Sequence, residues 1–167
     1  MHKYFDIYYF IDKFNLKELS NIKKKINIIF RDYSKKNDPH EILKTKFFCR
    51  KNGFNLYLAN NIKLAIKLNL DGAYLPSFNN KLNYKNLNCG KDFEIIGSAH
   101  NIKELKIKEQ QNCTKIFISP LFKTEKNKNY LDIIKFNLIA NETKEKVICL
   151  GGINSKTIKK VNLTKSN

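Results

Sequence analysis

Tryptophan is absent from this chain, and its four cysteines form neither a C-x-x-C pair nor a cysteine–histidine spacing typical of a structural zinc site. No G-x-G-x-x-G and no G-x-x-x-x-G-K-[ST] sequence follows an apolar run, which argues against a nucleotide-binding loop. No apolar run approaches the roughly 18 residues of a membrane span. Asp6 and Asp12 interrupt the first apolar stretch, which argues against a signal peptide. We therefore expect a cytoplasmic protein with no membrane segment.

Arginine is also scarce, although the chain is strongly basic. The formal net charge is +17, yet Arg31 and Arg50 are the only arginines. A charge of this size fits a polyanionic partner such as nucleic acid. Nucleic-acid-binding proteins, however, commonly use arginine for bidentate contacts to bases and phosphates. Nucleic-acid binding is therefore kept only as a remote alternative.

What the sequence does contain is a regular alternation of short apolar runs and amphipathic stretches. The apolar runs predict strands at residues 6–12, 26–33, 54–59, 72–77, 93–100, 115–122 and 146–152. The amphipathic stretches predict helices at residues 15–25, 38–53, 61–70, 101–112, 130–140 and 154–161. Strands that are apolar along their whole length are typical of a parallel sheet covered on both faces. Two α/β architectures fit this pattern, an open doubly wound sheet and a (β/α)8 barrel.

Local signals mark the ends of one helix and the edge of the predicted sheet. Asp38 is placed to cap a helix, Pro39 to occupy its first position and Gly53 to end it.

Polar residues or paired glycines also follow the predicted strands. Ligands bind at the carboxyl ends of the strands in a parallel sheet. The Gly151–Gly152 pair at the end of the last strand is suited to close approach of a ligand to the backbone.

Four segments together resemble one known family. Residues 64–76 read LAIKLNLDGAYLP, residues 94–105 read EIIGSAHNIKEL, residues 116–126 read IFISPLFKTEK and residues 149–153 read CLGGI. Their order and spacing are similar to those of the thiamine phosphate synthase and thiazole tautomerase family. The resemblance runs over nearly the whole chain, and it implies a (β/α)8 TIM barrel.

The resemblance also implies an eighth strand and helix, which this sequence lacks. We therefore expect residues 1–167 to form a single barrel domain that is incomplete at the C-terminus. Three explanations stay open: the chain is a fragment, a partner subunit of a homo-oligomer covers the gap, or the chain is a decaying paralogue.

The reaction implied by the resemblance joins a hydroxymethylpyrimidine pyrophosphate to a thiazole phosphate and releases pyrophosphate. Arg31 and Ser98 match family positions that contact pyrophosphate. The alternative role for Arg31 is an ion pair with Asp32 or a neighbouring loop, and for Ser98 it is a helix cap.

The phosphate of the thiazole is expected at two loops. Thr124 and Lys126 match the loop that follows the sixth strand, with Lys128 as the alternative to Lys126 because the loop length leaves the register open. Gly151 and Gly152 match the loop whose backbone N–H groups bind phosphate. A solvated loop for Lys126, and a tight strand-to-helix turn for the glycines, are the structural alternatives.

The metal site implied by the resemblance is altered. The family holds Mg²⁺ through two aspartates, but the matching positions carry Asn60, or Asn61 under a one-residue shift, and Asn79. Hard Mg²⁺ is usually held through carboxylates, so the loss of both should weaken metal binding. His100, near the end of the fifth strand, is either a base or a surface or capping histidine.

Three functions are therefore carried forward. The first is a thiamine phosphate synthase-like transferase, an enzyme of thiamine biosynthesis that acts on small phosphorylated heterocycles. The second is a non-catalytic or tautomerase-like binder of thiazole phosphate. The third and remote one is a basic nucleic-acid-binding protein.

Overall fold

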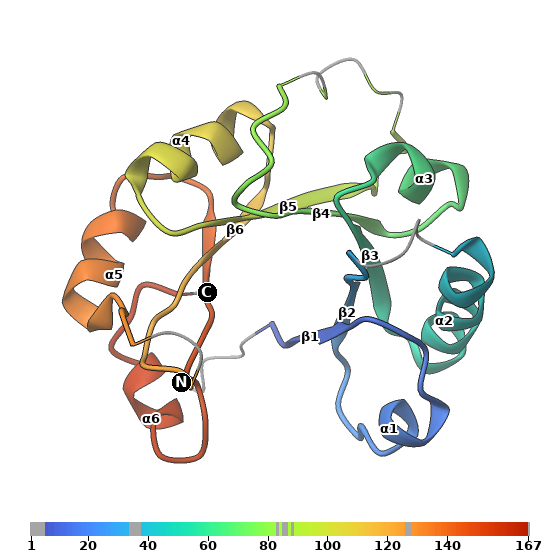
Figure 1. The fold of residues 1–167 in the computed structure, drawn as a ribbon, viewed down its shortest axis with the longest axis horizontal. Helices are drawn as coiled ribbons and strands as arrows, with labels where there is room; N and C mark the ends of the chain where they lie inside the picture. The colour runs from blue at the N-terminus through green and yellow to red at the C-terminus, as the bar shows by residue number, and fades with distance from the viewer. Residues whose placement is uncertain are drawn as a thin grey trace. The chain divides into compact units, whose positions relative to one another are not determined.

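The computed structural model describes residues 6–33, 38–82, 84, 87, 89–125 and 128–166. These residues form two compact units. The N-terminal unit comprises the described residues 6–74 together with 89–94, and the C-terminal unit comprises the described residues 75–87 and 95–166. Strands and helices alternate along the chain in both units, as Figure 1 shows and as the sequence pattern predicts.

The strands of the N-terminal unit pair in parallel and in chain order. They are β1 (Tyr8–Ile11), β2 (Asn27–Phe30), β3 (Asn55–Ala59) and β4 (Gly72–Leu75). Ile28 and Ile29 in β2 are both completely buried although they point to opposite faces of the sheet. Parallel strands buried on both faces need apolar residues at consecutive positions, which confirms the parallel α/β architecture.

The helices of this unit are α1 (Leu16–Ser20), α2 (Pro39–Asn52) and α3 (Ile62–Lys67), and they lie along one side of its strands (Figure 1). The predicted ends of α2 are confirmed. An Asp38 carboxylate oxygen accepts a hydrogen bond from the His40 N–H at 2.9 Å, and Pro39 begins the helix. Gly53 ends it with φ +67°, a left-handed conformation that glycine adopts without a steric penalty.

The C-terminal unit repeats the same plan. Its strands β5 (Glu94–Ala99), β6 (Lys115–Ile118) and β7 (Lys146–Cys149) pair in parallel and in chain order. Its helices are α4 (Ile102–Gln110), α5 (Asp132–Ala140) and α6 (Ile158–Val161). No helix in the described part of the chain is both long enough and apolar enough to span a membrane.

Several predicted elements are shorter in the structure; the helix predicted at 15–25, for example, spans only Leu16–Ser20. The strand predicted at 115–122 ends at Ile118, because the next residues leave the β-ladder and bond to the loop after β7. The helix predicted at 154–161 begins only at Ile158. Before it, the Thr157 hydroxyl accepts from the Asn154 N–H at 2.9 Å, so the polar side chains form a turn instead of the first helical turn.

The outer edge of β7 is contacted by the last described residues. The Cys149 N–H donates to the Ser166 hydroxyl oxygen at 3.0 Å, and Ser166 is fully buried. The Lys165 N–H donates to the Asn137 side-chain oxygen at 2.8 Å, which ties the same segment to α5. Among the described residues the strands are the seven named above, and closure of a barrel stays a prediction.

Candidate functional site

The sequence-predicted phosphate site lies in the C-terminal unit, at the carboxyl ends of β6 and β7. Two hydrogen bonds join the loops that follow these strands. The Leu121 N–H donates to the Leu150 carbonyl at 2.8 Å, and the Phe122 N–H donates to the Gly151 carbonyl at 3.1 Å. The loop after the sixth strand is therefore held directly against the glycine pair.

Both glycines are required where they stand. Gly151 has φ +93° and Gly152 has φ +70°, which are left-handed values that other residues rarely adopt. A Cβ atom on Gly152 would lie 2.5 Å from the Phe122 carbonyl oxygen, and one on Gly151 would lie 2.8 Å from Cβ of Pro120. The tight strand-to-helix turn, which was the structural alternative for the two glycines, is thus present. The group that lies close to the glycines is the chain's own loop after β6, here called the β6 loop.

The same turn leaves backbone donors available to a ligand. The N–H groups of Gly151, Gly152 and Ile153 donate no hydrogen bond to any residue in the described part of the chain. The Gly152 carbonyl is already used, because it accepts from the Thr157 hydroxyl at 2.9 Å. Backbone N–H groups without a protein acceptor form a site that favours an anion.

Thr124 follows the segment that contacts Gly152. The hypothetical Cβ of Gly152 would lie 2.7 Å from the Lys123 carbonyl oxygen, and Thr124 is the next residue, half-buried. The structure therefore brings Thr124 and the glycine turn into one region. Lys126, the other residue predicted for this loop, lies outside the described residues.

Ser98 lies in β5 and is 4% exposed. Its register partner is Phe117 in β6. The cap of α4 is Asn101, whose side-chain oxygen accepts from the Glu104 N–H at 2.9 Å. The alternative reading of Ser98 as a helix cap is therefore wrong, and its contact with pyrophosphate stays a prediction.

His100 is held more firmly than sequence reasoning indicated. Its Nδ1 lies 2.7 Å from the Ser119 carbonyl oxygen and 3.3 Å from the Ser119 hydroxyl. A carbonyl oxygen can only accept, so Nδ1 carries a hydrogen, and in the neutral imidazole Nε2 is then the acceptor. The His100 backbone N–H also donates to the Glu104 carboxylate at 2.8 Å. The contact with Ser119 crosses between two strand ends, so no local pattern predicts it.

Arg31 lies just beyond β2 in the N-terminal unit. Its backbone N–H donates to the Ile11 carbonyl at 2.7 Å, and its guanidinium carbon lies 4.7 Å from the centre of the Phe10 ring. In the described part of the chain its guanidinium forms no ion pair with a carboxylate. It lines a cavity of about 260 Å³ together with Asp12 and Glu18. The exposed cation is thus oriented by an aromatic ring, an arrangement that leaves its N–H groups free to bind an anion.

The two asparagines at the expected metal positions have different surroundings. Asn60, in the N-terminal unit, is exposed with φ +59°, and its N–H donates to the Tyr74 carbonyl at 2.8 Å. Its neighbour Asn61 caps α3, since its side-chain oxygen accepts from the Leu64 N–H at 3.1 Å. The expected metal position therefore falls either on Asn60, which is not the cap of α3, or on Asn61, which is.

Asn79, in the C-terminal unit, is 8% exposed and is bonded within its own loop. Its side-chain oxygen accepts from the Lys81 N–H at 3.0 Å, and its side-chain nitrogen donates to the Tyr84 hydroxyl at 3.0 Å. No group of three or more histidine, cysteine, aspartate or glutamate side chains suited to a metal ion occurs among the described residues. Neutral amides supply no carboxylate, so these two positions do not fit Mg²⁺.

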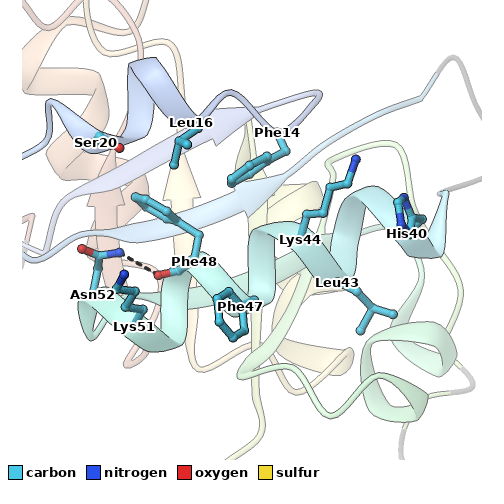
Figure 2. Close-up of a pocket in the computed structure, with 10 residues that line it drawn as sticks. All are labelled: Phe14, Leu16, Ser20, His40, Leu43, Lys44, Phe47, Phe48, Lys51 and Asn52. Carbon is cyan, nitrogen blue, oxygen red and sulfur yellow. Dashed lines mark hydrogen bonds between the residues drawn. The ribbon is translucent and has the colours of Figure 1, made fainter.

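A separate groove of about 610 Å³ is lined by α2 and by residues in and just before α1 (Figure 2). Among its apolar lining residues, Phe14 precedes α1 and Leu16 begins it, whereas Leu43, Phe47 and Phe48 belong to α2 (Figure 2). None of the residues predicted for the functional site lines this groove. Its apolar side chains are typical of a contact surface, and Ser20, His40, Lys44, Lys51 and Asn52 complete its lining.

Comparison with known proteins places these features in a family. A family model described as thiamine monophosphate synthase matches residues 20–166. A solved structure, a thiamine phosphate pyrophosphorylase from Pyrococcus furiosus, is similar to this chain with a TM-score of 0.73 and 17% sequence identity. That match covers 96% of this chain and 83% of the other, and it shows a shared fold. No curated protein matches the chain.

Proposed function

The chain belongs to the thiamine monophosphate synthase family, and from that premise we propose that it joins a hydroxymethylpyrimidine pyrophosphate to a thiazole phosphate. The products are thiamine monophosphate and pyrophosphate. The observation that carries the proposal is the turn at Gly151–Ile153, whose N–H groups have no acceptor among the described residues and lie beside the loop of Thr124. This turn can bind the phosphate of one substrate.

Phosphate binding here depends on backbone geometry more than on side-chain charge. Hydrogen bonds from N–H groups to an ionised oxygen are shorter and about twice as strong as neutral ones. The glycine turn is rigid, because both loops are bonded to each other and the Gly152 carbonyl is bonded to Thr157. A preorganised turn loses little entropy when the phosphate binds, which favours affinity.

In the proposed reaction the bond between the pyrimidine methylene carbon and the pyrophosphate oxygen breaks. The electron pair leaves with pyrophosphate, and the lone pair of the thiazole nitrogen then forms the new carbon–nitrogen bond. The positive charge ends on the thiazolium ring, so no proton needs to be moved. The protein therefore has to hold the two substrates in line and stabilise the leaving anion.

Arg31 and Ser98 are proposed to contact the leaving pyrophosphate. Arg31 can offer a planar pair of N–H groups, and its orientation over Phe10 restricts the side chain before ligand binding. Ser98 is buried near the carboxyl end of β5, the edge of a parallel sheet at which ligands bind. Each role is tested by its own substitution, Arg31→Lys and Ser98→Ala, with the KM for the pyrophosphate substrate as the measurement.

No step of this proposal passes through Mg²⁺, because Asn60 and Asn79 do not supply carboxylates. The resemblance nevertheless implies the ion, so the reaction is to be followed with and without millimolar Mg²⁺. A large stimulation by Mg²⁺ would show that other oxygen atoms, including those of the substrate pyrophosphate, hold it.

The test is incubation of the full chain with both substrates and chromatographic detection of thiamine monophosphate. Product that depends on both substrates supports the proposal, and Gly152→Asp should abolish it by placing a carboxylate in the turn. A folded protein that forms no product with or without Mg²⁺ would overturn it.

The second candidate is a non-catalytic or tautomerase-like binder of thiazole phosphate. It is favoured by the fixed His100 tautomer, whose Nε2 can accept a proton, and by the absence of a metal-holding group among the described residues. It predicts calorimetric binding of thiazole phosphate with no thiamine monophosphate formed. Binding should again be lost in Gly152→Asp.

A further inference from the structure

α4 of the C-terminal unit carries a buried cation that the proposed reaction does not use. Lys108 is completely buried, and its ammonium donates three hydrogen bonds. The acceptors are the Pro76 carbonyl at 2.8 Å, the Asn79 carbonyl at 2.7 Å and the Gln111 side-chain oxygen at 2.8 Å. An ammonium has three donors, so this group is fully satisfied without water.

Gln111 extends the same contact. It is also completely buried, and its side-chain nitrogen donates to the Asn79 carbonyl at 2.8 Å and to the Lys81 carbonyl at 2.8 Å. Residues 76–82, here called the β4 loop, therefore present three backbone carbonyls to the side chains of Lys108 in α4 and of Gln111, the residue that caps the end of α4. Lys108 and Gln111, which are three residues apart, thus hold the segment that directly follows the carboxyl end of β4.

The neighbouring strand leaves space for the lysine stem. A Cβ atom on Gly97 in β5 would lie 2.8 Å from Cδ of Lys108 and 2.8 Å from the Cys113 sulfur. Any larger residue at 97 would displace the stem or the thiol. A buried lysine is rare unless it is paired, so a fully bonded one beside a glycine indicates a specific role.

The charge state agrees with this geometry. Burial lowers the pKa of Lys108 to about 8, while Glu104 on the same helix and the Cys113 thiol act to raise it. The groups that contact the ammonium, from Pro76, Asn79 and Gln111, are not ionisable, and neither is Gly97 of β5 beside the lysine stem. The side chain is therefore mainly protonated at pH 7.

We propose that Lys108 is a positioning residue that, together with Gln111, holds the β4 loop in one conformation at the edge where ligands bind. The contact turns the Pro76 and Asn79 carbonyl oxygens toward α4, and so away from an anionic ligand, which these oxygens would repel. The effect of Lys108 on catalysis rests on the proposed function. Its effect on the conformation of the β4 loop does not depend on that function.

The first test is amide hydrogen exchange in Lys108→Ala. Within the loop, the Asn79 N–H donates to the Pro76 carbonyl and the Lys81 N–H donates to the Asn79 side chain, so both amides report its order. We expect at least about a tenfold loss of protection at these amides, because three hydrogen bonds to a charged donor are removed. The exposed Lys103→Ala on the same helix is the matched control and should leave both amides unchanged.

Rescue distinguishes a cation-dependent loop from general loss of packing. Lys108→Ala leaves three oxygen acceptors around a space that an ammonium ion can enter. Ammonium chloride should restore the protection, whereas tetramethylammonium chloride at the same ionic strength cannot donate hydrogen bonds and should not. Unchanged protection in Lys108→Ala, or equal recovery with both salts, would overturn the proposal.

A second variant covers the case in which Lys108→Ala does not fold. Gln111→Met removes the donors to the Asn79 and Lys81 carbonyls but leaves the ammonium in place. It should lower the protection of the same two amides, and a folded Gln111→Met with full protection would overturn the proposal.

The catalytic arm measures KM and kcat for thiamine monophosphate formation. In Lys108→Ala the KM should rise several-fold with a smaller change in kcat, and ammonium should lower it again. Lost loop protection with unchanged KM would overturn the positioning role. If the wild-type chain forms no thiamine monophosphate, the proposed function fails, and the exchange experiment still decides whether Lys108 holds the loop.

Discussion

Gly152→Ala is the substitution for which the structure gives the sharpest expectation. Gly152 has φ +70°, and a Cβ there would lie 2.5 Å from the Phe122 carbonyl oxygen and 2.7 Å from the Lys123 carbonyl oxygen. Both contacts are to backbone, so no side chain can rotate to relieve them. The β6 loop or the glycine turn must move.

Gly53→Ala is the matched control. Gly53 has nearly the same backbone conformation, φ +67°, but a Cβ there would meet nothing within 4 Å. The left-handed conformation alone costs an L-residue about 1–2 kcal/mol. Overpacking typically adds about 1–3 kcal/mol. The free energy of unfolding should therefore fall by about 1–2 kcal/mol in Gly53→Ala and by about 2–5 kcal/mol in Gly152→Ala.

Urea unfolding measures these stabilities, and calorimetry with thiazole phosphate measures binding. Displacement of one backbone donor removes a hydrogen bond to an ionised oxygen, worth about 1.5–3 kcal/mol, so affinity should fall by about tenfold to a hundredfold in Gly152→Ala. Gly53→Ala should bind normally. Equal stability loss in the two variants would refute the steric argument, and unchanged affinity in Gly152→Ala would refute the assignment of the turn to phosphate.

Three further outcomes are expected. Tyr57→Phe should lower the free energy of unfolding by about 1–3 kcal/mol in urea unfolding, because the buried hydroxyl donates to the Glu94 carboxylate at 2.7 Å. Burial raises the pKa of the Cys113 thiol to about 12, so the thiol stays protonated at pH 8. Its labelling by a thiol reagent should therefore follow global unfolding, and fast labelling of the native protein would contradict this. Arg31→Lys keeps the charge but loses the planar donor pair over Phe10, so the KM for the pyrophosphate substrate should rise about tenfold, whereas an unchanged KM would show that charge alone suffices.

The candidate site could be predicted only in part from the sequence. Gly151 and Gly152 were identified because paired glycines after an apolar run carry a local conformational signal, and the structure shows the left-handed turn. The position of Ser98 was identified by resemblance, but its structural alternative as a cap could be removed only once Asn101 was seen to cap α4. The bond between His100 and Ser119 spans two strand ends and has no signature in the sequence.

By itself the sequence determined the alternation of strands and helices, the parallel character of the strands and the ends of α2. These features depend on apolar periodicity and on residues such as Asp38 and Gly53, which act through their own backbone and their next few neighbours. Only the tertiary structure decided that Lys108 is buried, because its partner Asn79 lies 29 residues away in the chain. A helical lysine reads as solvent-exposed until a distant loop supplies its acceptors, and that pairing is fixed by packing across the whole unit.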